Sequence, residues 1–374
     1  MSFKFVDLFC GIGGFHHALK SLGGECVLAC DIDAKCREMY SSNFGLTPVS
    51  DIRELKEEDV PDHDVLCGGA PCQSWSSSGK KLGFEDARGT LIYDVVRIAR
   101  AKKPKYLLLE NVKHIMKIQK GEPFRLILEE FEKLGYTMKT VVLSPHQFGV
   151  PQNRERVYFM GVLNGALGDM PTPLKEKHTI LGEYSAKYKV KKEVEDAFNA
   201  WNETFHILKQ TKTKVPVLLD EFKNSDDLST YSAWKRKYVE ENKKIYAIDP
   251  EFWDTWMTKH ADVLSKRKVY RKLEWQVGSY AEDESIWDHF IQLRQSGMRV
   301  KKATFFPTLV AIVQTPIYGP EHRFLTPREC ARLQSFPDSH ILHEKDQIAY
   351  KQLGNSVNVV VVHHVASYLL AQAS

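Results

Sequence analysis

The chain has 374 residues, of which 43% are hydrophobic and 27% charged, the composition of an ordinary folded protein with room for about two domains. Basic residues number 52 and acidic residues 48, a balance that permits a nucleic-acid partner without requiring one. No run of about 18 apolar residues occurs, and the first residues lack the basic start and long apolar region of a signal peptide, so we expect a cytoplasmic protein without a membrane span.

The seven cysteines contain no Cys-x-x-Cys pair, which argues against a zinc knuckle or a redox dithiol. Cys26 and Cys30 lie near His16 and His17 in the sequence, but this spacing is not that of a known metal site. We therefore predict reduced, mostly buried cysteines and no bound metal.

The first predicted element is a short apolar strand over residues 3–9, followed by a glycine turn that contains Gly11 and Gly13. Phe15 and Leu19 then recur at helical spacing. A strand, a glycine turn and a helix form the first unit of a doubly wound α/β sheet, in which the turn closely approaches a cofactor.

A second strand over residues 25–30 ends at Asp31. An acidic side chain about 20 residues after a glycine turn suits a ribose, because it accepts hydrogen bonds from both hydroxyls. Asp51 and Ile52 follow the next strand, where they can pair a carboxylate and an amide with an adenine while the isoleucine packs on its face. A helix cap is the alternative role for either aspartate.

The glycine turn alone suits NAD, flavin or S-adenosylmethionine equally. Asp7, inside the strand ahead of the turn, favours S-adenosylmethionine, because its carboxylate repels a pyrophosphate but not a sulfonium or an amino group. S-adenosylmethionine is therefore the predicted cofactor.

Another apolar strand over residues 65–67 leads into the loop Gly-Gly-Ala-Pro-Cys-Gln-Ser-Trp-Ser at 68–76. Cys72 follows the carboxyl end of that strand, where ligands bind in open α/β sheets. The serines and glycines up to residue 89 are typical of a mobile loop. The alternative for Cys72 is a small core residue, a common use of free cysteine.

An apolar strand over residues 106–109 comes next and is predicted to stop at Glu110. A carboxylate directly after a buried strand is costly unless it is partnered or has chemistry to perform, and a helix cap is its alternative role. Arg154 and Arg156 lead into a later strand, where a bidentate contact to an anion or base competes with a surface ion pair to Glu155.

Residues 165–322 differ in character, since six of the seven tryptophans fall there, and such tryptophans belong to a core more often than to a base-stacking platform. Residues 289–320 contain no acid, which suits contacts with DNA phosphates and grooves, an ordinary solvated face being the alternative. The cations of this stretch are Arg294, Arg299, Lys301 and Lys302.

Six sequence blocks, in this order, resemble the C5-cytosine DNA methyltransferases, specifically the compact single-chain enzymes of bacterial restriction-modification systems. The blocks are Asp-Leu-Phe-Cys-Gly-Ile-Gly-Gly-Phe from residue 7, Gly-Ala-Pro-Cys-Gln-Ser-Trp-Ser from 69, Glu-Asn-Val from 110, Gln-Asn-Arg-Glu-Arg from 152, Leu-Thr-Pro-Arg-Glu-Cys-Ala-Arg-Leu-Gln from 325 and Gln-Leu-Gly-Asn-Ser-Val from 352. The resemblance covers residues 1–163 and 323–374.

The resemblance implies a doubly wound, Rossmann-like class I S-adenosylmethionine-dependent domain over residues 1–172 and 340–374, with the last helix packed beside the cofactor site. A smaller, irregular target-recognition domain with a bridging segment would occupy residues 173–339. Asp31 departs from the glutamate common at the ribose position. The predicted cofactor residues are Phe9, Gly11, Gly13, Asp31, Ile32, Asp51, Ile52, Leu91 and Asn355.

The implied reaction is methylation of carbon 5 of a cytosine that is flipped out of double-stranded DNA. The Cys72 thiolate adds to carbon 6 of the ring while Glu110 hydrogen-bonds the N3 edge. Arg156, with Arg154, would hold the base and the neighbouring phosphate. The predicted DNA contacts in the loop that closes over the base are Ser76 and Ser78.

We expect a monomer that binds double-stranded DNA, either as the modification enzyme of a restriction-modification system or as an orphan methylase. A tRNA cytosine-5 methyltransferase of the same fold is the nearest rival, disfavoured by the long segment 165–322. A catalytically silent DNA- or cofactor-binding protein and an NAD-dependent oxidoreductase are competing hypotheses from different functional classes. The intact Cys72, Glu110 and Arg156 favour an active enzyme.

Overall fold

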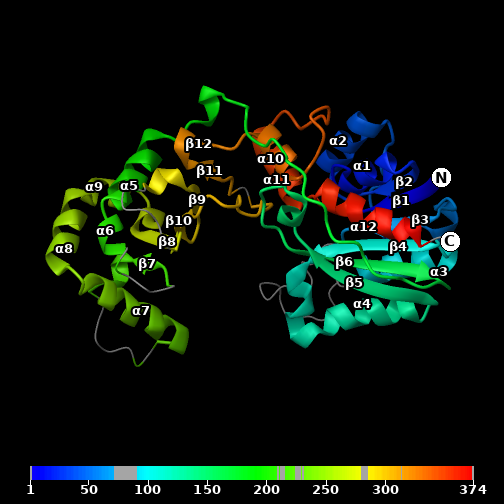
Figure 1. Cartoon of the computed structure of the whole chain (residues 1–374), viewed down its shortest axis with the longest axis horizontal. Helices are drawn as coiled ribbons and strands as arrows, with labels where there is room; N and C mark the ends of the chain where they lie inside the picture. The colour runs from blue at the N-terminus through cyan, green and yellow to red at the C-terminus, as the bar shows by residue number, and fades with distance from the viewer. Residues whose placement is uncertain are drawn as a thin grey trace. The chain divides into compact units, whose positions relative to one another are not determined.

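The computed structural model describes residues 2–70, 91–208, 210, 215–223, 229, 231–278, 285–312 and 314–372. The chain forms two compact units (Figure 1). Unit 1 comprises Met1–Gly182, Thr308–Val313 and Pro327–Ser374, and unit 2 comprises Glu183–Pro307 and Gln314–Thr326. The predicted boundaries, after residues 172 and 339, differ from these limits, because residues 173–182, 308–313 and 327–339 also belong to unit 1.

The sheet of unit 1 has six strands in the order β2-β1-β3-β4-β6-β5. Strand β1 pairs in parallel with β2 and β3, and β3 with β4, whereas β6 runs antiparallel to β4 and β5. The carboxyl ends of four parallel strands thus meet at one edge, which confirms the predicted doubly wound α/β fold. The strands are β1 (Phe3–Leu8), β2 (Gly24–Cys30), β3 (Val65–Gly68), β4 (Tyr106–Val112), β5 (Tyr136–Leu143) and β6 (Arg156–Leu163).

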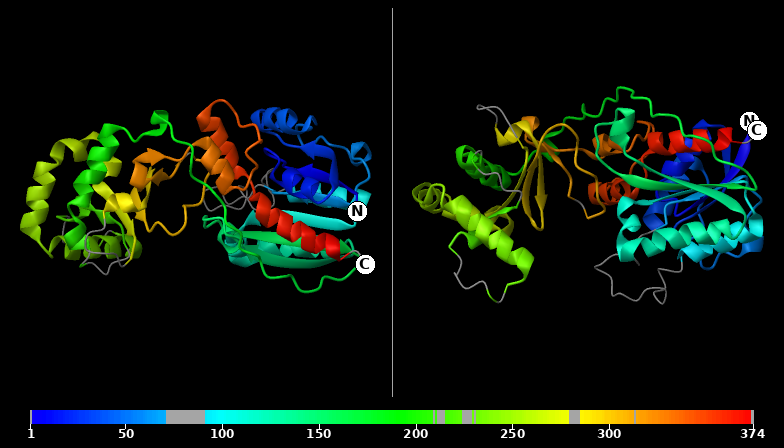
Figure 2. Two further views of the ribbon diagram at one scale, coloured as in Figure 1. Left: turned by 45° about the horizontal axis from the view of Figure 1, so that its top comes forward. Right: turned by 60° about the horizontal axis from the view of Figure 1, so that its bottom comes forward.

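Helices cover both faces of this sheet, because successive strand residues point to opposite sides and both sides are apolar. In β4, Tyr106 and Leu108 join the core under α1 and α12, while Leu107 and Leu109 join the core under α3 and α4. Figure 2 shows α12 and α4 on opposite sides of the strands. The helices are α1 (Gly14–Ser21), α2 (Ala34–Phe44), α3 (Leu91–Lys102), α4 (Glu122–Glu132), α10 (Pro327–Leu333), α11 (Asp346–Asn355) and α12 (Val359–Ala371).

Strand β4 is longer than predicted. It pairs with β6 from Tyr106 to Val112, so Glu110 lies within the strand instead of after it. The apolar run ends at Leu109, but the hydrogen bonds of the ladder continue past it, and a period-based prediction cannot detect those bonds.

The last helix of the chain packs against the first, a contact that was not predicted. Val361 and Val365 of α12 and Phe15 and Leu19 of α1 lie in one buried core. By length and composition alone, the segment Asp346–Ala371 could cross a membrane, but 56% of its most apolar window is buried inside the protein. Its apolar side chains are therefore used in packing.

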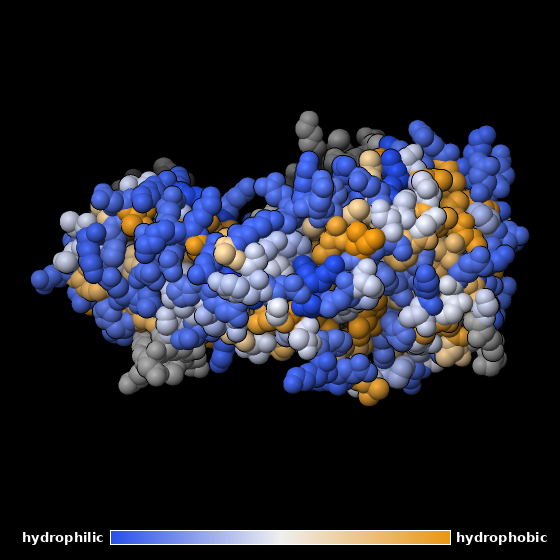
Figure 3. Space-filling view, turned by 90° about the horizontal axis from the view of Figure 1, so that it is seen from above, coloured by the Kyte–Doolittle hydropathy of each residue, from blue (hydrophilic) through white to orange (hydrophobic). Residues whose placement is uncertain are grey.

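Unit 2 has its own six-stranded sheet, in the order β12-β11-β9-β10-β8-β7, and its own core. Trp201, Trp253 and Trp256 are almost completely buried in that core, which confirms the structural role predicted for them, whereas Trp234 is exposed. Hydrophilic residues cover much of the face drawn in Figure 3, with apolar residues between them. The elements are α5 (Lys192–Asn202), α6 (Phe205–Leu208), β7 (Val217–Leu218), α7 (Ala233–Tyr246), α8 (Pro250–Lys259), α9 (Ala261–Lys266), β8 (Lys272–Gln276), β9 (Phe290–Arg294), β10 (Gly297–Lys301), β11 (Ile317–Tyr318) and β12 (Arg323–Phe324).

Candidate active site

The glycine turn and Asp31 meet at the carboxyl ends of β1 and β2. The Asp31 carboxylate accepts the N–H of Gly11 at 2.8 Å through one oxygen and the N–H of Asp33 at 2.8 Å through the other. Burial raises the pKa of this carboxyl, an effect that the two N–H donors oppose. A Cβ at Gly11 would have no atom within 4 Å, so open space adjoins the turn there, whereas a Cβ at Gly13 would overlap the Phe44 ring.

Two side chains that were expected to face the cofactor, Asp7 and Ile52, are instead buried in the protein interior. Asp7 is fully buried between Tyr40 and Cys67, so its carboxyl does not line the open space at the turn. Ile52 is 3% exposed and belongs to the core, so, contrary to the prediction, its side chain is not placed to pack on the face of an adenine. Ile32, by contrast, is 70% exposed.

The remaining predicted cofactor residues lie at the margins of the same sheet edge. The Asp51 carboxylate is held by the Arg53 guanidinium, whose Nε lies 2.9 Å from one oxygen and 3.1 Å from the other. This pairing lowers the pKa of Asp51. Phe9 and Leu91 are half-buried against the core, and Asn355 is exposed at the end of α11.

Glu110 and Arg156 form a largely buried ion pair on neighbouring antiparallel strands. The Arg156 Nε donates to Glu110 Oε1 at 2.9 Å, and the side chains are 15% and 11% exposed for arginine and glutamate. Burial raises the pKa of Glu110 despite the opposing charges of Arg156 and Arg154. The pair therefore combines a carboxyl whose pKa is raised by burial with a cation that fixes its direction.

Arg154 has a different environment from Arg156. It is 3% exposed, and its guanidinium donates to the carbonyls of Leu309 at 2.7 Å, Gly354 at 3.0 Å and Ser356 at 2.8 Å. Burial lowers its pKa to about 9. This geometry corrects the prediction that Arg154 holds the base and a phosphate, because both terminal nitrogens donate to main-chain carbonyls and join three segments of unit 1, while the buried Nε has no hydrogen-bond partner in the described part of the chain.

The predicted nucleophile Cys72 and the loop serines Ser76 and Ser78 lie outside the described residues. The chain that leads to them is described up to Ala70, whose carbonyl accepts from Asn111 Nδ2 at 3.1 Å. A Cβ at Gly69 would lie 3.4 Å from Glu110 Oε2. The parallel register of β3 and β4 therefore brings the start of the cysteine loop against Glu110.

The cations predicted to bind DNA lie on or directly after the β9–β10 hairpin of unit 2. Arg294 and Arg299 both pair with Glu274 of β8, at 3.1 Å and 2.6 Å. Lys301 is half-buried, and burial lowers its pKa, whereas Lys302 is exposed. The stretch 289–320 contains no acid, but a neighbouring strand supplies one, so one of the four predicted positive charges is offset and two of the cations are held by that acid.

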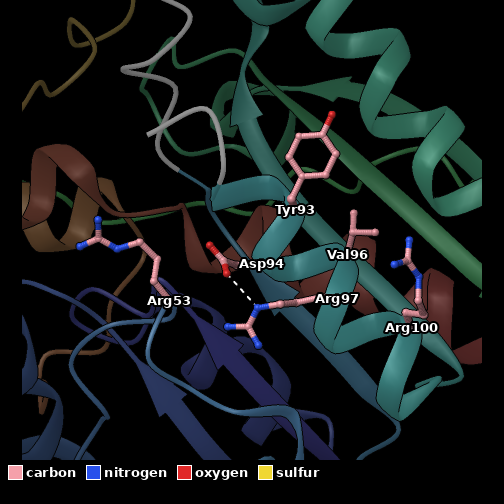
Figure 4. A pocket seen from close by; sticks show the side chains of 6 residues that line it. All are labelled: Arg53, Tyr93, Asp94, Val96, Arg97 and Arg100. Atoms are coloured by element: carbon pink, nitrogen blue, oxygen red, sulfur yellow. Dashed lines mark hydrogen bonds and ion pairs between the residues drawn. The ribbon is translucent and has the colours of Figure 1, made fainter. Parts of the chain in front are cut away.

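A cavity of about 370 Å³ opens beside Arg53 and helix α3 (Figure 4). The cavity is lined by Arg53, Tyr93, Asp94, Val96, Arg97 and Arg100. This lining was not predicted, because Arg53 lies 40 positions before the first of the α3 residues and forms no local pattern with them.

Among the described residues, no group of three or more His, Cys, Asp or Glu is arranged to hold a metal ion.

Comparisons with known proteins agree over nearly the whole chain. Residues 3–371 match the family model described as C-5 cytosine-specific DNA methylase. The chain is 34% identical to the Type II methyltransferase M1.ScrFI of Lactococcus lactis subsp. cremoris, across 98% of this chain and 78% of that protein. It is 32% identical to the Type II methyltransferase M.HhaI of Haemophilus parahaemolyticus, across 97% and 93%.

Solved structures share the fold. A putative DNA modification methyltransferase encoded within an E. coli prophage has a TM-score of 0.61 at 20% identity, across 98% of both chains. A Spodoptera frugiperda DNMT2 mutant has a TM-score of 0.58 at 19% identity, across 98% of this chain and 99% of that one.

Proposed function

The chain belongs to the C-5 cytosine-specific DNA methylase family and is a DNA cytosine-5 methyltransferase, and from this premise we propose how its site works. We infer that the methyl group passes from S-adenosylmethionine to carbon 5 of a cytosine flipped out of a specific double-stranded sequence, through a covalent adduct with Cys72. The observation that supports this most is the position of Gly69, three residues before Cys72, where a Cβ would lie 3.4 Å from Oε2 of Glu110, the partner of Arg156.

The residues at the glycine turn fit S-adenosylmethionine. Gly11 adjoins open space, and each Asp31 oxygen accepts one main-chain N–H and retains a lone pair for a ribose hydroxyl. The exposed Ile32 offers an apolar surface for the adenine, and the Asp51 carboxylate an acceptor for its amino group. When bound, this cofactor supplies an electrophilic methyl group and leaves as S-adenosylhomocysteine.

Further cofactor contacts are proposed from the resemblance. Phe9 and Leu91 lie at the rim of the apolar core on this edge of the sheet. Asn355, in its Gly-Asn-Ser turn, is assigned to the methionine moiety, and its exposure at the end of α11 permits that contact.

The protein groups then act on the cytosine ring. Cys72 adds as a thiolate to carbon 6, and the electrons displaced from the ring double bond make carbon 5 nucleophilic. Glu110, whose pKa burial raises, hydrogen-bonds the N3 edge in its protonated form and stabilises the adduct. After loss of the carbon-5 proton, the bond between sulfur and carbon 6 breaks and the thiolate is restored.

DNA contacts outside the catalytic loop are proposed for unit 2. Lys302 is exposed and suited to a phosphate, with Lys301 beside it. Arg294, Arg299 and Glu274 together carry one net positive charge, so the two arginines are proposed to reach DNA only as part of that bonded group.

A duplex that contains 5-fluorocytosine at the target position tests the covalent step. Fluorine cannot leave as a cation after methyl transfer, so the enzyme should remain attached to the DNA and migrate as a covalent complex in denaturing gels. Cys72→Ser should abolish the complex, and peptide mapping should place the wild-type attachment at Cys72. An equal yield from Cys72→Ser would show that another residue is the nucleophile.

We further propose that the protein acts as a monomer on double-stranded DNA in the cytoplasm, as the modification enzyme of a restriction-modification system or as an orphan methylase. A cognate endonuclease is compatible with this role but need not bind the enzyme. DNA is proposed as the substrate in preference to tRNA, because the relatives that span nearly the whole chain are named Type II methyltransferases. Bisulfite sequencing of DNA from a host that expresses the chain would identify the methylated sequence.

A further inference from the structure

Arg97 of α3 is bonded through all three guanidinium nitrogens. Its Nε donates to Asp94 at 2.9 Å, its Nη1 pairs with Glu57 at 3.0 Å, and its Nη2 donates to the main-chain carbonyl of Ile52 at 2.5 Å. Figure 4 shows Arg97 and Asp94 beside Arg53 at the cavity. The Arg97 guanidinium thus ties the turn at residues 51–53 to helix α3.

The position of this bond gives it a consequence for Asp51. Ile52 is the next residue after Asp51, so a fixed Ile52 carbonyl restricts the backbone from which the Asp51 carboxylate projects. Arg53, which lines the cavity, also restrains Asp51, because its guanidinium donates to both oxygens of the Asp51 carboxylate. The carboxylate therefore has one direction before any ligand arrives, and such preorganisation reduces the ordering cost of binding.

The charges around Arg97 also favour a role in fixing the backbone over a role in attracting an anionic ligand. Asp94 and Glu57 together offset the positive charge of Arg97, and Asp51 offsets that of Arg53. The cavity wall is consequently not an anion site at these residues, and the bonds of the two arginines are directed to protein atoms. Together, the bonds of Arg53 and Arg97 fix the position of residues 51 and 52.

We propose that Arg97 is a positioning residue for the adenine end of S-adenosylmethionine: it holds the turn at residues 51–53 so that Asp51 accepts a hydrogen bond from the adenine amino group. This inference rests on the proposed cofactor role of Asp51. It names a specificity-determining residue on α3 that makes no ligand contact itself.

The test compares two ligands that differ only at this amino group. S-adenosylhomocysteine carries the amino group, whereas its 6-deamino analogue, which has an unsubstituted purine in place of adenine, carries only hydrogen at carbon 6 and offers Asp51 no donor there. Calorimetric titration of both ligands, without DNA, gives a discrimination ratio of dissociation constants. The wild-type ratio should be large, and Arg97→Gln should reduce it by roughly tenfold or more, as expected when a charge-assisted hydrogen bond loses its geometry.

Arg100→Gln is the matched control. Arg100 lies one turn further along α3 and lines the same cavity, but within the described part of the chain it has no ion pair or hydrogen bond. This variant should retain the wild-type ratio. Arg97→Lys keeps the charge but loses the three-way fork, so it should also lower the ratio, and it decides the matter if Arg97→Gln does not fold.

The outcomes separate two ideas. A wild-type protein that binds S-adenosylhomocysteine but shows a ratio near one would overturn the adenine role of Asp51, and with it this inference. A large wild-type ratio that persists in Arg97→Gln, or in Arg97→Lys, would overturn the role of Arg97 alone. A merely structural role would lower the affinities for both ligands equally and leave the ratio unchanged.

Discussion

At the scale of single residues, burial gives Glu110 its chemical role. Burial raises the pKa of its carboxyl, and the charges of Arg156 and Arg154 only partly oppose this. A carboxyl with a raised pKa keeps its proton to higher pH than an exposed glutamate, and loses it as the pH rises through the raised value. Methyl transfer should therefore decline on the alkaline side of its pH profile.

We expect Glu110→Gln to lower the single-turnover rate by roughly 10²–10⁴-fold and to remove that alkaline decline, because an amide does not titrate. The rate of methyl transfer, followed from about pH 6 to about pH 9, checks this. Glu155→Gln is a suitable control, since Glu155 is a half-exposed carboxylate paired with Lys113 close to the same strand. An alkaline decline that survives in Glu110→Gln belongs to another group.

Arg154 and Arg156 are two residues apart and should differ in function. Arg154→Met removes the guanidinium from three buried carbonyls, of which that of Ser356 keeps a bond from Gln334 Nε2 at 3.3 Å, so the free energy of unfolding should fall by at least about 2 kcal/mol. Arg156→Met should instead lower turnover, because it releases Glu110. Urea unfolding and single-turnover rates separate the two effects. An Arg154→Met protein of normal stability and weakened DNA binding would restore its predicted phosphate contact.

At the scale of secondary-structure elements, the sequence predicts what depends on near neighbours. Strands β1 to β3 were predicted within one or two residues, but the strand expected before Asp51 is only an isolated bridge between Cys30 and Val49. The contact of Asp31 with the glycine turn follows from the pairing of consecutive parallel strands. The role of Arg154 was missed because its acceptors lie at least 155 residues away. The charges of Arg294 and Arg299 were overestimated because Glu274 lies on another strand, outside the acid-free stretch.

Helix α1 meets a distant segment through histidines. The rings of His17 and His340 are hydrogen-bonded at 2.9 Å, and His16 stacks on Phe44 at 3.7 Å between ring centres. Burial lowers the pKa of His16 to about 3, that of His17 to about 4 and that of His340 to about 3. Lys20 beside His16 and His17, and Arg328 beside His340, act in the same direction.

Because these folded histidines resist protonation while unfolded ones accept it, their contribution to stability is complete above about pH 6.5 and is lost as the pH falls toward about 4. The free energy of unfolding should thus fall over that range by more than about 1 kcal/mol. His340→Phe, which preserves the packing on Phe336, should flatten the dependence, while the exposed His114→Asn should not. An unchanged slope in His340→Phe would place the acid sensitivity elsewhere.

At the scale of the whole molecule, the catalytic unit is assembled from the two ends of the chain. The residues that precede α12 include Asn355 and the acceptors of Arg154, while the glycine turn and Asp31 come from the beginning of the chain. The core shared by α1 and α12 is what joins these ends. The cofactor edge of the sheet should therefore be complete only when the final helix has folded.

Val365 and Val360 of α12 test this dependence. Val365 is fully buried in the shared core, whereas Val360 is half-buried at its margin. Val365→Ala should lower the free energy of unfolding by about 2–3 kcal/mol, and Val360→Ala by less than about 1 kcal/mol. S-adenosylhomocysteine should raise the unfolding midpoint of both variants, because its site and this core unfold together. If unit 1 instead lost α12 in a separate early transition, hydrogen exchange would show α12 opening without β1, and the two chain ends would be independent folding units.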